Sequence, residues 1–409
     1  MKINDIATLA TTAITPQPEV HYHLYSLPAF DDNQTREELP GYGIQSNKYN
    51  VPDKCILFNK LNVRFKRVWR IDNADTNKIC STEFLPLVIN EDKVDYNYCY
   101  YLLISKRITD YLCGQNTNTS GSHKRIDPTN FLNIELASLP SLESQKRIGY
   151  LLSAIDKKID INRAINQNLE ALAKQLYDYW FVQFDFPDEK GRPYKSSGGK
   201  MVWNEKLRRY IPVGWHNGNL FEIATFTNGL ACQKYRPQDG EPSFPVIKIR
   251  EMHDGISKET EVVTTNIPEN VKVYNGDVLF SWSASLEVMQ WAYGIGGLNQ
   301  HIFKVTSANE FPRAFYYFQL LDYVNVFKKI AEARKTTMGH ITQDHLQQST
   351  IAIPDDKAIT YTFEEKISPM LERIVKQQEE ITQLTKQRDE LLPLLMNGQV
   401  SVNSDLSHD

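Results

Sequence analysis

Two short stretches of the sequence join glycine to hydroxyl-bearing and basic side chains, and they occupy comparable places in the two halves of the chain. Cationic groups bind DNA phosphates, while hydroxyl and guanidinium groups also hydrogen-bond to base edges. We therefore predict that both stretches contact DNA. The predicted side chains are Ser120, Ser122, His123, Lys124 and Arg125 in the first stretch, and Arg334, Lys335, Thr336, Thr337 and His340 in the second.

Further basic residues cluster outside these stretches. Between Lys60 and Arg70, five cationic side chains fall within eleven residues. If Val63 to Ile71 form a strand, alternation sends Arg64, Lys66 and Arg70 to one face. That face either contacts DNA or is a solvated face of a sheet. The comparable set in the second half of the chain comprises Lys234, Tyr235, Arg236, Lys248 and Arg250.

Catalytic chemistry finds little support in the sequence. The Asn-Pro-Pro or Asp-Pro-Pro motif of an adenine methyltransferase does not occur, and Gly294 to Gly297 is better interpreted as a turn than as a cofactor loop. Pro187-Asp188 and Pro354-Asp355 lack the flanking spacing of a nuclease centre. His21 and His23 share a strand face, but two histidines without further ligands do not make a metal site. We expect no catalytic residue, no metal and no cofactor.

The residues predicted to bind DNA lie in two modules of mixed helix and strand, at 1–140 and 216–354. In both modules turn residues separate short apolar runs, which is the pattern of an α+β unit. Each module also contains one apolar helical segment, Asp95 to Leu112 in the first and Phe311 to Ala331 in the second. Prolines, glycines and charged residues indicate that 182–215 is a connector.

Two long helices are predicted at 141–181 and 355–398, each with apolar rows at heptad spacing. In the first helix one row holds Ile148, Ile155, Asn162, Leu169 and Leu176, and the neighbouring row holds Leu151, Ile165 and Leu172. In the second helix one row holds Ile367, Ile374, Ile381, Arg388 and Leu395, and the other holds Met370, Leu384 and Leu391. Seams this narrow predict that the helices pair with each other.

The chain thus repeats one pattern: mixed module, helix, basic stretch, strand ending at proline, and long helix. Ile148 and Ile367 begin the equivalent rows and are 219 positions apart. Solenoid repeats are several times shorter. The pattern predicts an α+β protein whose two modules are joined by two long antiparallel coiled-coil helices, with approximate two-fold symmetry. A polar tail follows at 399–409.

Composition limits the remaining choices. The chain of 409 residues is long enough for two or three domains, and it contains no apolar run long enough to span a membrane. The net charge of −4 argues against indiscriminate coating of nucleic acid, although local basic patches are compatible with specific binding. Five cysteines without a CxxC pair indicate free thiols in a reducing cytoplasm.

The first long helix and its flanks resemble the central conserved region of type I restriction-modification specificity subunits. The resemblance rests on Pro140, Glu143, the run from Gln145 to Ile148, an Asn- and Leu-rich helix and the closing pair Trp180-Phe181. The second module adds IPVGW at Ile211 to Trp215, IKIRE at Ile247 to Glu251, NGDVLFSWSAS at Asn275 to Ser285 and GLNQHIFKV at Gly297 to Val305, which are similar to motifs of that family's target-recognition domains. The second long helix departs from the family pattern, because it lacks the proline-acidic-glutamine run.

The resemblance implies a non-catalytic subunit in which each module reads one half of a split DNA target. It also implies that the helices set the distance between the half-sites and bind two methyltransferase subunits, through which restriction subunits join the complex. We expect the partner surface on the outer face of the first helix. Its predicted residues are Gln145, Arg147, Arg163, Asn166, Trp180 and Phe181.

An alternative is a coiled-coil scaffold whose modules bind protein partners, and periodicity alone does not separate the scaffold from a DNA reader. A self-sufficient restriction enzyme is disfavoured by the missing catalytic motifs. Salt dependence distinguishes the first two functions, since binding to phosphates weakens steeply as the salt concentration rises.

Overall fold

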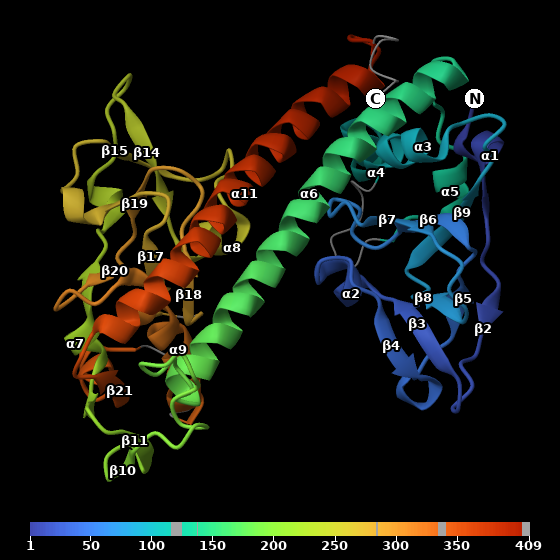
Figure 1. Ribbon diagram of the computed structural model, residues 1–409. Coiled ribbons are helices and arrows are strands. Elements are labelled where there is room, and N and C mark those ends of the chain that lie inside the picture. The colour runs from blue at the N-terminus through green and yellow to red at the C-terminus, as the bar shows by residue number, and fades with distance from the viewer. Residues whose placement is uncertain (116–124, 137, 284, 334–340, 403–409) are drawn as a thin grey trace. The chain divides into compact units, whose positions relative to one another are not determined.

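The computed structural model describes residues 1–115, 125–136, 138–283, 285–333 and 341–402 (Figure 1). The chain divides into two compact units, Met1–Lys158 with Leu384–Asp409 and Ile159–Gln383. Helix α6 (Leu142–Tyr177) begins in the first unit and ends in the second, and α11 (Ala358–Met396) runs from the second into the first. Among the described residues, no helix combines the length and the apolar character needed to cross a membrane.

Two sheets form the core of the first unit. The antiparallel sheet β1-β9-β6-β7 has four strands, and the mixed sheet β2-β5-β8-β3-β4 contains one parallel pair, β3 with β8. The strands of the former are β1 (Ala7–Leu9), β6 (Lys54–Asn59), β7 (Val68–Asp72) and β9 (Phe84–Ile89). Those of the latter are β2 (Ala13–Ile14), β3 (His21–Tyr25), β4 (Glu37–Pro40), β5 (Lys48–Asn50) and β8 (Lys78–Cys80). The helices are α1 (Ile3–Ile6), α2 (Leu27–Asp31), η1 (Gly41–Gly43), α3 (Tyr96–Ile104), α4 (Lys106–Gln115) and α5 (Pro128–Leu132).

The second unit contains an antiparallel sheet, β13-β20-β17-β18, a mixed sheet, β15-β14-β19-β16, and the two-stranded pairs β10-β11 and β12-β21. Its first sheet is built from β13 (Ala224–Asn228), β17 (Val278–Ser281), β18 (Glu287–Gln290) and β20 (Ile302–Ser307). The other strands are β10 (Met201–Asn204), β11 (Arg209–Pro212), β12 (Trp215–Gly218), β14 (Ser243–Ile247), β15 (Val262–Thr264), β16 (Lys272–Val273), β19 (Gly296–Leu298) and β21 (Ile351–Pro354). The helices are η2 (Asp178–Val182), α7 (Leu220–Ile223), η3 (Cys232–Lys234), α8 (Ile249–Asp254), η4 (Glu269–Val271), α9 (Arg313–Ala333) and α10 (Gln343–Gln347).

The two antiparallel sheets share one topology. In each sheet the first strand pairs with the last, and the last then pairs with the second. In each unit a single helical turn precedes the first strand of this sheet, and a carboxylate caps that turn. Asp5 accepts the Lys2 N–H at 2.6 Å in the first unit, and Glu222 accepts the Asn219 N–H at 3.0 Å in the second. The common strand order confirms the predicted internal repeat.

Helices α6 and α11 pack antiparallel within each unit. In the second unit Asn162 Nδ2 donates to Glu380 Oε2 at 2.8 Å, and the rings of Tyr177 and Phe363 are 6.2 Å apart. In the first unit Arg388 Nη1 donates to Asp156 Oδ1 at 3.0 Å. Later residues of α6 therefore meet earlier residues of α11, as predicted for an antiparallel pair.

The buried face of α6 differs from the predicted one. The row that contains Ile148 and Asn162 is buried at those positions as expected, but Ile165 and Leu172 of the predicted neighbouring row are exposed. The second buried row is displaced by one residue and consists of Gln145, Leu152, Ile159, Asn166, Ala173 and Trp180. The two rows are thus offset by four residues, whereas the prediction placed them three residues apart, along Leu151, Ile165 and Leu172.

Two other predicted elements are interrupted. The strand predicted from Val63 to Ile71 starts only at Val68, because 61–67 form a turn between β6 and β7. The helix predicted from Asp95 to Leu112 is broken at Ser105, whose extended backbone ends α3. The Ser105 carbonyl then accepts the Thr109 N–H at 3.2 Å and starts α4.

Candidate nucleic-acid interface and partner surface

The basic stretch of the first unit ends beside strand β6. Arg125 forms a bridge with Leu61, and the Ile126 N–H donates to the Lys60 carbonyl oxygen at 2.9 Å. Lys60 directly follows β6, and its own N–H donates to the Glu83 carbonyl oxygen at 2.9 Å. The end of the stretch is therefore fixed beside the β6–β7 turn.

The second unit repeats this arrangement. Ile341 follows the second basic stretch, and its N–H donates to the carbonyl oxygen of Trp282 at 2.9 Å. Trp282 directly follows β17, which holds the place in its sheet that β6 holds in the first unit. The residues that directly follow the two basic stretches, Ile126 and Ile341, are thus bound at equivalent strand ends, one in each unit.

Most of the predicted residues in these stretches lie outside the described residues. They are Ser120, Ser122, His123 and Lys124 in the first unit, and Arg334, Lys335, Thr336, Thr337 and His340 in the second. Arg125 is described, and its guanidinium binds both carboxylate oxygens of Glu83 at 2.7 to 3.1 Å. These hydrogen bonds raise the pKa of Arg125.

The β6–β7 turn gathers arginines around an exposed ring. Phe65 is 48% exposed, and its ring centroid lies 4.8 Å from the guanidinium of Arg64 and 5.2 Å from that of Arg67. Lys66 of the same turn is exposed. An aromatic ring beside cations is a combination typical of surfaces that bind nucleic acid. Phe65 was absent from the predicted site, although the run Arg-Phe-Lys-Arg contained the signal.

The predicted cations of the second unit converge on one carboxylate. Lys248 Nζ binds Glu261 at 2.5 Å, and this hydrogen bond is the main reason why the pKa of Glu261 is lowered. The nearby charges of Arg236 and Arg250 lower it further. Arg250 also pairs with Glu251 at 2.7 Å.

Lys234 and Tyr235 adjoin this cationic group. Both side chains are exposed, and the Tyr235 carbonyl oxygen accepts the Thr264 N–H of β15 at 2.9 Å. The structure therefore places all five predicted residues of this set around β14, β15 and the turns at their ends.

Arg70 is held by contacts within the first unit. Its guanidinium donates to Ser153 Oγ at 3.0 Å and to Asn97 Oδ1 at 3.3 Å, and it lies 4.3 Å from the ring centroid of Tyr100. The expected common face with Arg64 and Lys66 was wrong, because only Arg70 lies on a strand. Its contacts join the sheet to α3 and α6.

Gln145 is buried rather than presented to a partner. Its Oε1 accepts the Asp95 N–H at the start of α3 (2.9 Å), and its Nε2 donates to the Pro140 carbonyl oxygen (2.9 Å). The repeat offset of 219 positions leads to Glu364, which accepts the Ala314 N–H at the start of α9 (2.5 Å). The two residues therefore dock equivalent helices in their own units. The second long helix keeps this contact despite its different sequence.

Three other predicted partner residues are also buried. Asn166 faces α11 and donates to the Ile374 carbonyl oxygen at 3.4 Å. Trp180 and Phe181 belong to the core of the second unit, where the Phe181 ring lies 5.0 Å from that of Phe363. The expectation that they lie on the outer face of the helix was wrong, because Asn166 packs toward α11 and the two aromatic residues fill the core just past the end of α6.

Arg147 and Arg163 remain accessible. Arg147 forms an ion pair with Glu143 at 3.5 Å and lines a hollow of about 680 Å³ together with Arg107 and the end of α11. Arg163 is 57% exposed and pairs with Asp160 at 3.6 Å. Both residues stay predictions as partner contacts.

Helix α6 exposes an apolar row in the second unit. Ile161, Ile165 and Leu172 are 46%, 36% and 50% exposed. Spacings of four and seven residues place them on one face of the helix. Tyr179 and Val182 continue the exposed apolar surface past the helix end. We call these five residues the α6 apolar row.

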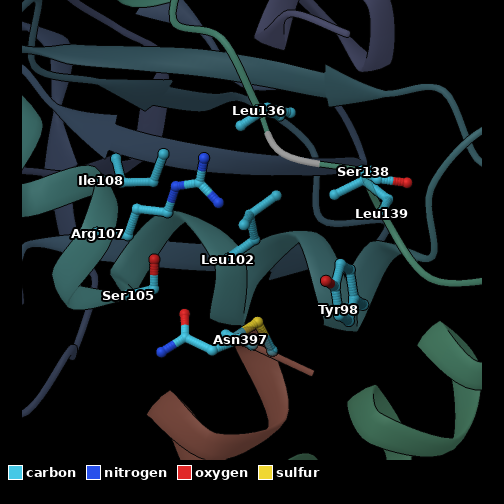
Figure 2. A pocket seen from close by; sticks show the side chains of 10 residues that line it. Tyr98, Leu102, Ser105, Arg107, Ile108, Leu136, Ser138, Leu139 and Asn397 are labelled. Atoms are coloured by element: carbon cyan, nitrogen blue, oxygen red, sulfur yellow. The ribbon is translucent and has the colours of Figure 1, made fainter. Parts of the chain in front are cut away.

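The end of α11 packs closely on α3 in the first unit. Figure 2 shows Tyr98 and Leu102 of α3 on one side of a small cavity and Asn397 on the other. The cavity measures about 20 Å³, which is room for about one water molecule. This contact is therefore a packed junction and not a ligand pocket.

Comparison with known proteins gives a consistent result. The family model for the type I restriction modification DNA specificity domain matches residues 1–171 and 212–391. The chain is 23% identical over 334 residues to the type I restriction enzyme MjaIX specificity subunit of Methanocaldococcus jannaschii. The aligned region covers 80% of this chain and 74% of that protein. It is 23% identical over 423 residues to the HindI specificity subunit of Haemophilus influenzae, with 89% of each chain covered. The crystal structure of the type I restriction-modification S subunit from M. genitalium shares the fold, with a TM-score of 0.60, 14% identity and coverage of 97% of this chain and 95% of that one.

Proposed function

The chain belongs to the family of type I restriction modification DNA specificity domains, and we propose that it reads a two-part DNA target with one half-site bound by each unit. The observation that carries the proposal is the equivalent attachment of the residues that directly follow the two basic stretches, Ile126 at Lys60 in the first unit and Ile341 at Trp282 in the second. Two copies of one reading surface suit a target with two separated parts. In this function the chain selects the DNA, and methyl transfer and cleavage belong to partner subunits.

Paired alanine substitutions test each half-site separately. Lys124→Ala with Arg125→Ala should weaken recognition of one half-site, and Arg334→Ala with Lys335→Ala the other. Each pair removes two cationic contacts, so we expect affinity to fall about tenfold or more and the salt slope to fall by about two. The measurement is competition binding by the assembled complex, with duplexes in which one or the other half-site is scrambled. The target itself comes from mapping methylated adenines in the host genome.

Lys93→Ala is the matched control, because Lys93 is exposed in the loop between β9 and α3. It should leave both half-sites unchanged. If both paired variants bind as tightly as the unaltered chain, the strand ends do not read DNA. Binding that does not respond to salt would instead support the protein scaffold.

We further propose that a methyltransferase subunit docks on the α6 apolar row. Interface cores are apolar, and exposed apolar patches on otherwise polar surfaces mark contact sites. The row supplies an apolar surface on α6 that the chain itself leaves exposed. Its position replaces the buried residues Gln145, Asn166, Trp180 and Phe181 as the centre of the partner surface.

Ile165→Asp with Leu172→Asp should strongly weaken this docking. Each change puts a charge into the apolar core of the interface, and we expect the affinity for the methyltransferase subunit to fall about a hundredfold. Analytical gel filtration of the mixed subunits measures the loss. Gln167→Asp is the control, since Gln167 is exposed on another face of the same helix. An equal loss from the control would show that the row is not the docking surface.

We propose the cytoplasm as the site of action. All five cysteines are free, and four of them are buried. Burial raises the pKa of the Cys99 thiol to about 12, so this thiol stays protonated and unreactive. Free thiols fit a reducing compartment.

A further inference from the structure

Asp156 lies where four elements of the first unit meet. Its carboxylate belongs to α6, is 13% exposed, and accepts hydrogen bonds from the Tyr101 hydroxyl of α3 and from Arg388 of α11 at 3.0 Å. Arg70 of β7 approaches the same carboxylate to 3.6 Å. One side chain thereby connects the β1-β9-β6-β7 sheet, helix α3 and both long helices.

Arg70 strengthens this junction through further contacts. Its guanidinium donates to Ser153 of α6 and to Asn97 at the start of α3, and it lies over the rings of Tyr100 and Tyr101. Burial, followed by the negative charge of Asp156, raises the pKa of Tyr101, so the hydroxyl keeps its proton and remains a donor. The polar groups of this cluster therefore hold each other in defined positions.

A second attachment lies nearer the start of α6. Gln145 receives the Asp95 N–H of α3, and Gly149 packs so closely that an added Cβ would lie 2.7 Å from Asp95 Oδ1. From Gln145 to Asp156 the helix rises about 16 Å. One attachment point alone permits rocking about that point, whereas two points this far apart fix the angle of the module on α6.

We propose that Asp156 is a positioning residue that fixes the first reading module on the long helices and so limits which half-site spacings the protein accepts. The inference rests on the proposed function, since it concerns how the two half-sites are measured. DNA half-sites rotate by about 34° for each base pair added between them, because B-DNA has about 10.5 base pairs per turn. A module held at a fixed angle rejects such a displaced half-site, and a loosened module tolerates it.

The second unit offers no equivalent cluster at the matching positions. The offset of 219 residues relates Asp156 to Val375, and Arg388 to Leu169. Both are apolar, and Leu169 packs against the core of its unit. Loss of the Asp156 cluster should therefore loosen the first module and leave the second unchanged.

Asp156→Asn tests the proposal in the complete complex. The change removes the charge that holds two arginines but keeps the size of the side chain. The measurement is the ratio of affinities for the native target and for targets with one base pair added to or removed from the spacer. We expect this ratio to fall about tenfold while discrimination between correct and scrambled half-sites stays the same. A purely structural loss would lower both forms of discrimination together.

Asp389→Asn is the matched control, because Asp389 also binds Arg388 at 2.9 Å but is 61% exposed. It should keep the full spacing preference.

If Asp156→Asn does not fold, Tyr101→Phe removes one hydrogen bond to Asp156 and should reduce the ratio about threefold. Spacing discrimination that is unchanged in a folded variant overturns the role of Asp156. Failure of the unaltered complex to distinguish half-sites would instead contradict the proposed function.

Discussion

The two units attach their modules to the long helices by different chemistry. In the first unit the junction is ionic and polar, built on Asp156, Arg70 and Arg388. In the second it is aromatic: the Phe363 ring of α11 lies 5.0 Å from that of Phe181, 5.7 Å from Trp180 and 6.0 Å from Phe318 of α9. One repeated topology has therefore acquired two different junctions.

The two kinds of junction should contribute differently to the stability of a unit and to the angle at which its module is held. Buried aromatic rings contribute large apolar areas and tolerate small shifts of angle. A buried ion cluster adds less net stability, because desolvation opposes the attraction between charges, but it requires each partner in place. We therefore expect substitutions in the second junction to affect mainly the free energy of unfolding. Substitutions in the first junction should affect mainly the selection of half-site spacing.

Phe363→Ala should have the largest effect on stability. Phe363 is fully buried, and truncation of such a ring leaves a cavity and costs about 3–5 kcal/mol. Urea unfolding followed by tryptophan fluorescence measures the loss, since Trp180 and Trp215 both belong to this aromatic region. The transition of the second unit should move to lower urea concentration while that of the first unit stays in place.

Leu394→Ala is the control for Phe363→Ala on the same helix. Leu394 is 37% exposed, so its truncation should cost well under the value for a buried ring, about 1 kcal/mol or less. A loss below about 1 kcal/mol for Phe363→Ala itself would show that the ring cluster does not hold the second junction together.

Much of this architecture was predictable from the sequence. The first heptad row of α11 was correct, since Ile367, Ile374 and Ile381 are buried, whereas Met370, Leu384 and Leu391 of the second row are half-buried. The internal repeat was correct, because the antiparallel sheets of the two units have the same strand order. The strand at Phe84–Ile89 coincides with an apolar run bounded by turn residues, which is the pattern on which the prediction of an α+β unit rested.

The face of α6 was not predictable in the same way. Two candidate rows lie one residue apart and hold similar numbers of apolar residues, and the row through Ile165 and Leu172 is exposed. The buried row includes Asn166 and Gln145, whose amides bond to backbone groups of other elements. Apolar periodicity cannot distinguish a face that packs within the chain from one that awaits another subunit.

The basic residues were located from the sequence, but which of them remain exposed was not, for a related reason. Arg64 and Arg70 are close in sequence, yet one is exposed in a turn and the other joins an ion cluster with Asp156. Arg125 and Lys60 are far apart in sequence but meet through the Ile126–Lys60 hydrogen bond. Charge counts locate basic residues, whereas partners in other elements decide which of them remain exposed.

The smallest effect should come from Glu364→Gln, which tests the one contact that the two junctions share. Glu364 accepts the Ala314 N–H at the start of α9, where Gln145 in the first unit accepts the Asp95 N–H at the start of α3. A carboxylate at a helix N-terminus interacts favourably with the helix dipole. Glutamine keeps an acceptor but removes the charge, so we expect a loss of about 0.5–1 kcal/mol in the urea transition of the second unit.

Glu365→Gln is the control for this substitution. Glu365 is exposed and directly follows Glu364, so its replacement removes the same charge from the helix without touching the contact to α9. It should leave the transition unchanged. Equal losses for the two variants would mean that the net charge of the helix matters rather than the cap on α9. A loss as large as that of Phe363→Ala would mean that Glu364, and not the aromatic cluster, dominates the second junction. The contrast between an aromatic and an ionic attachment would then fail.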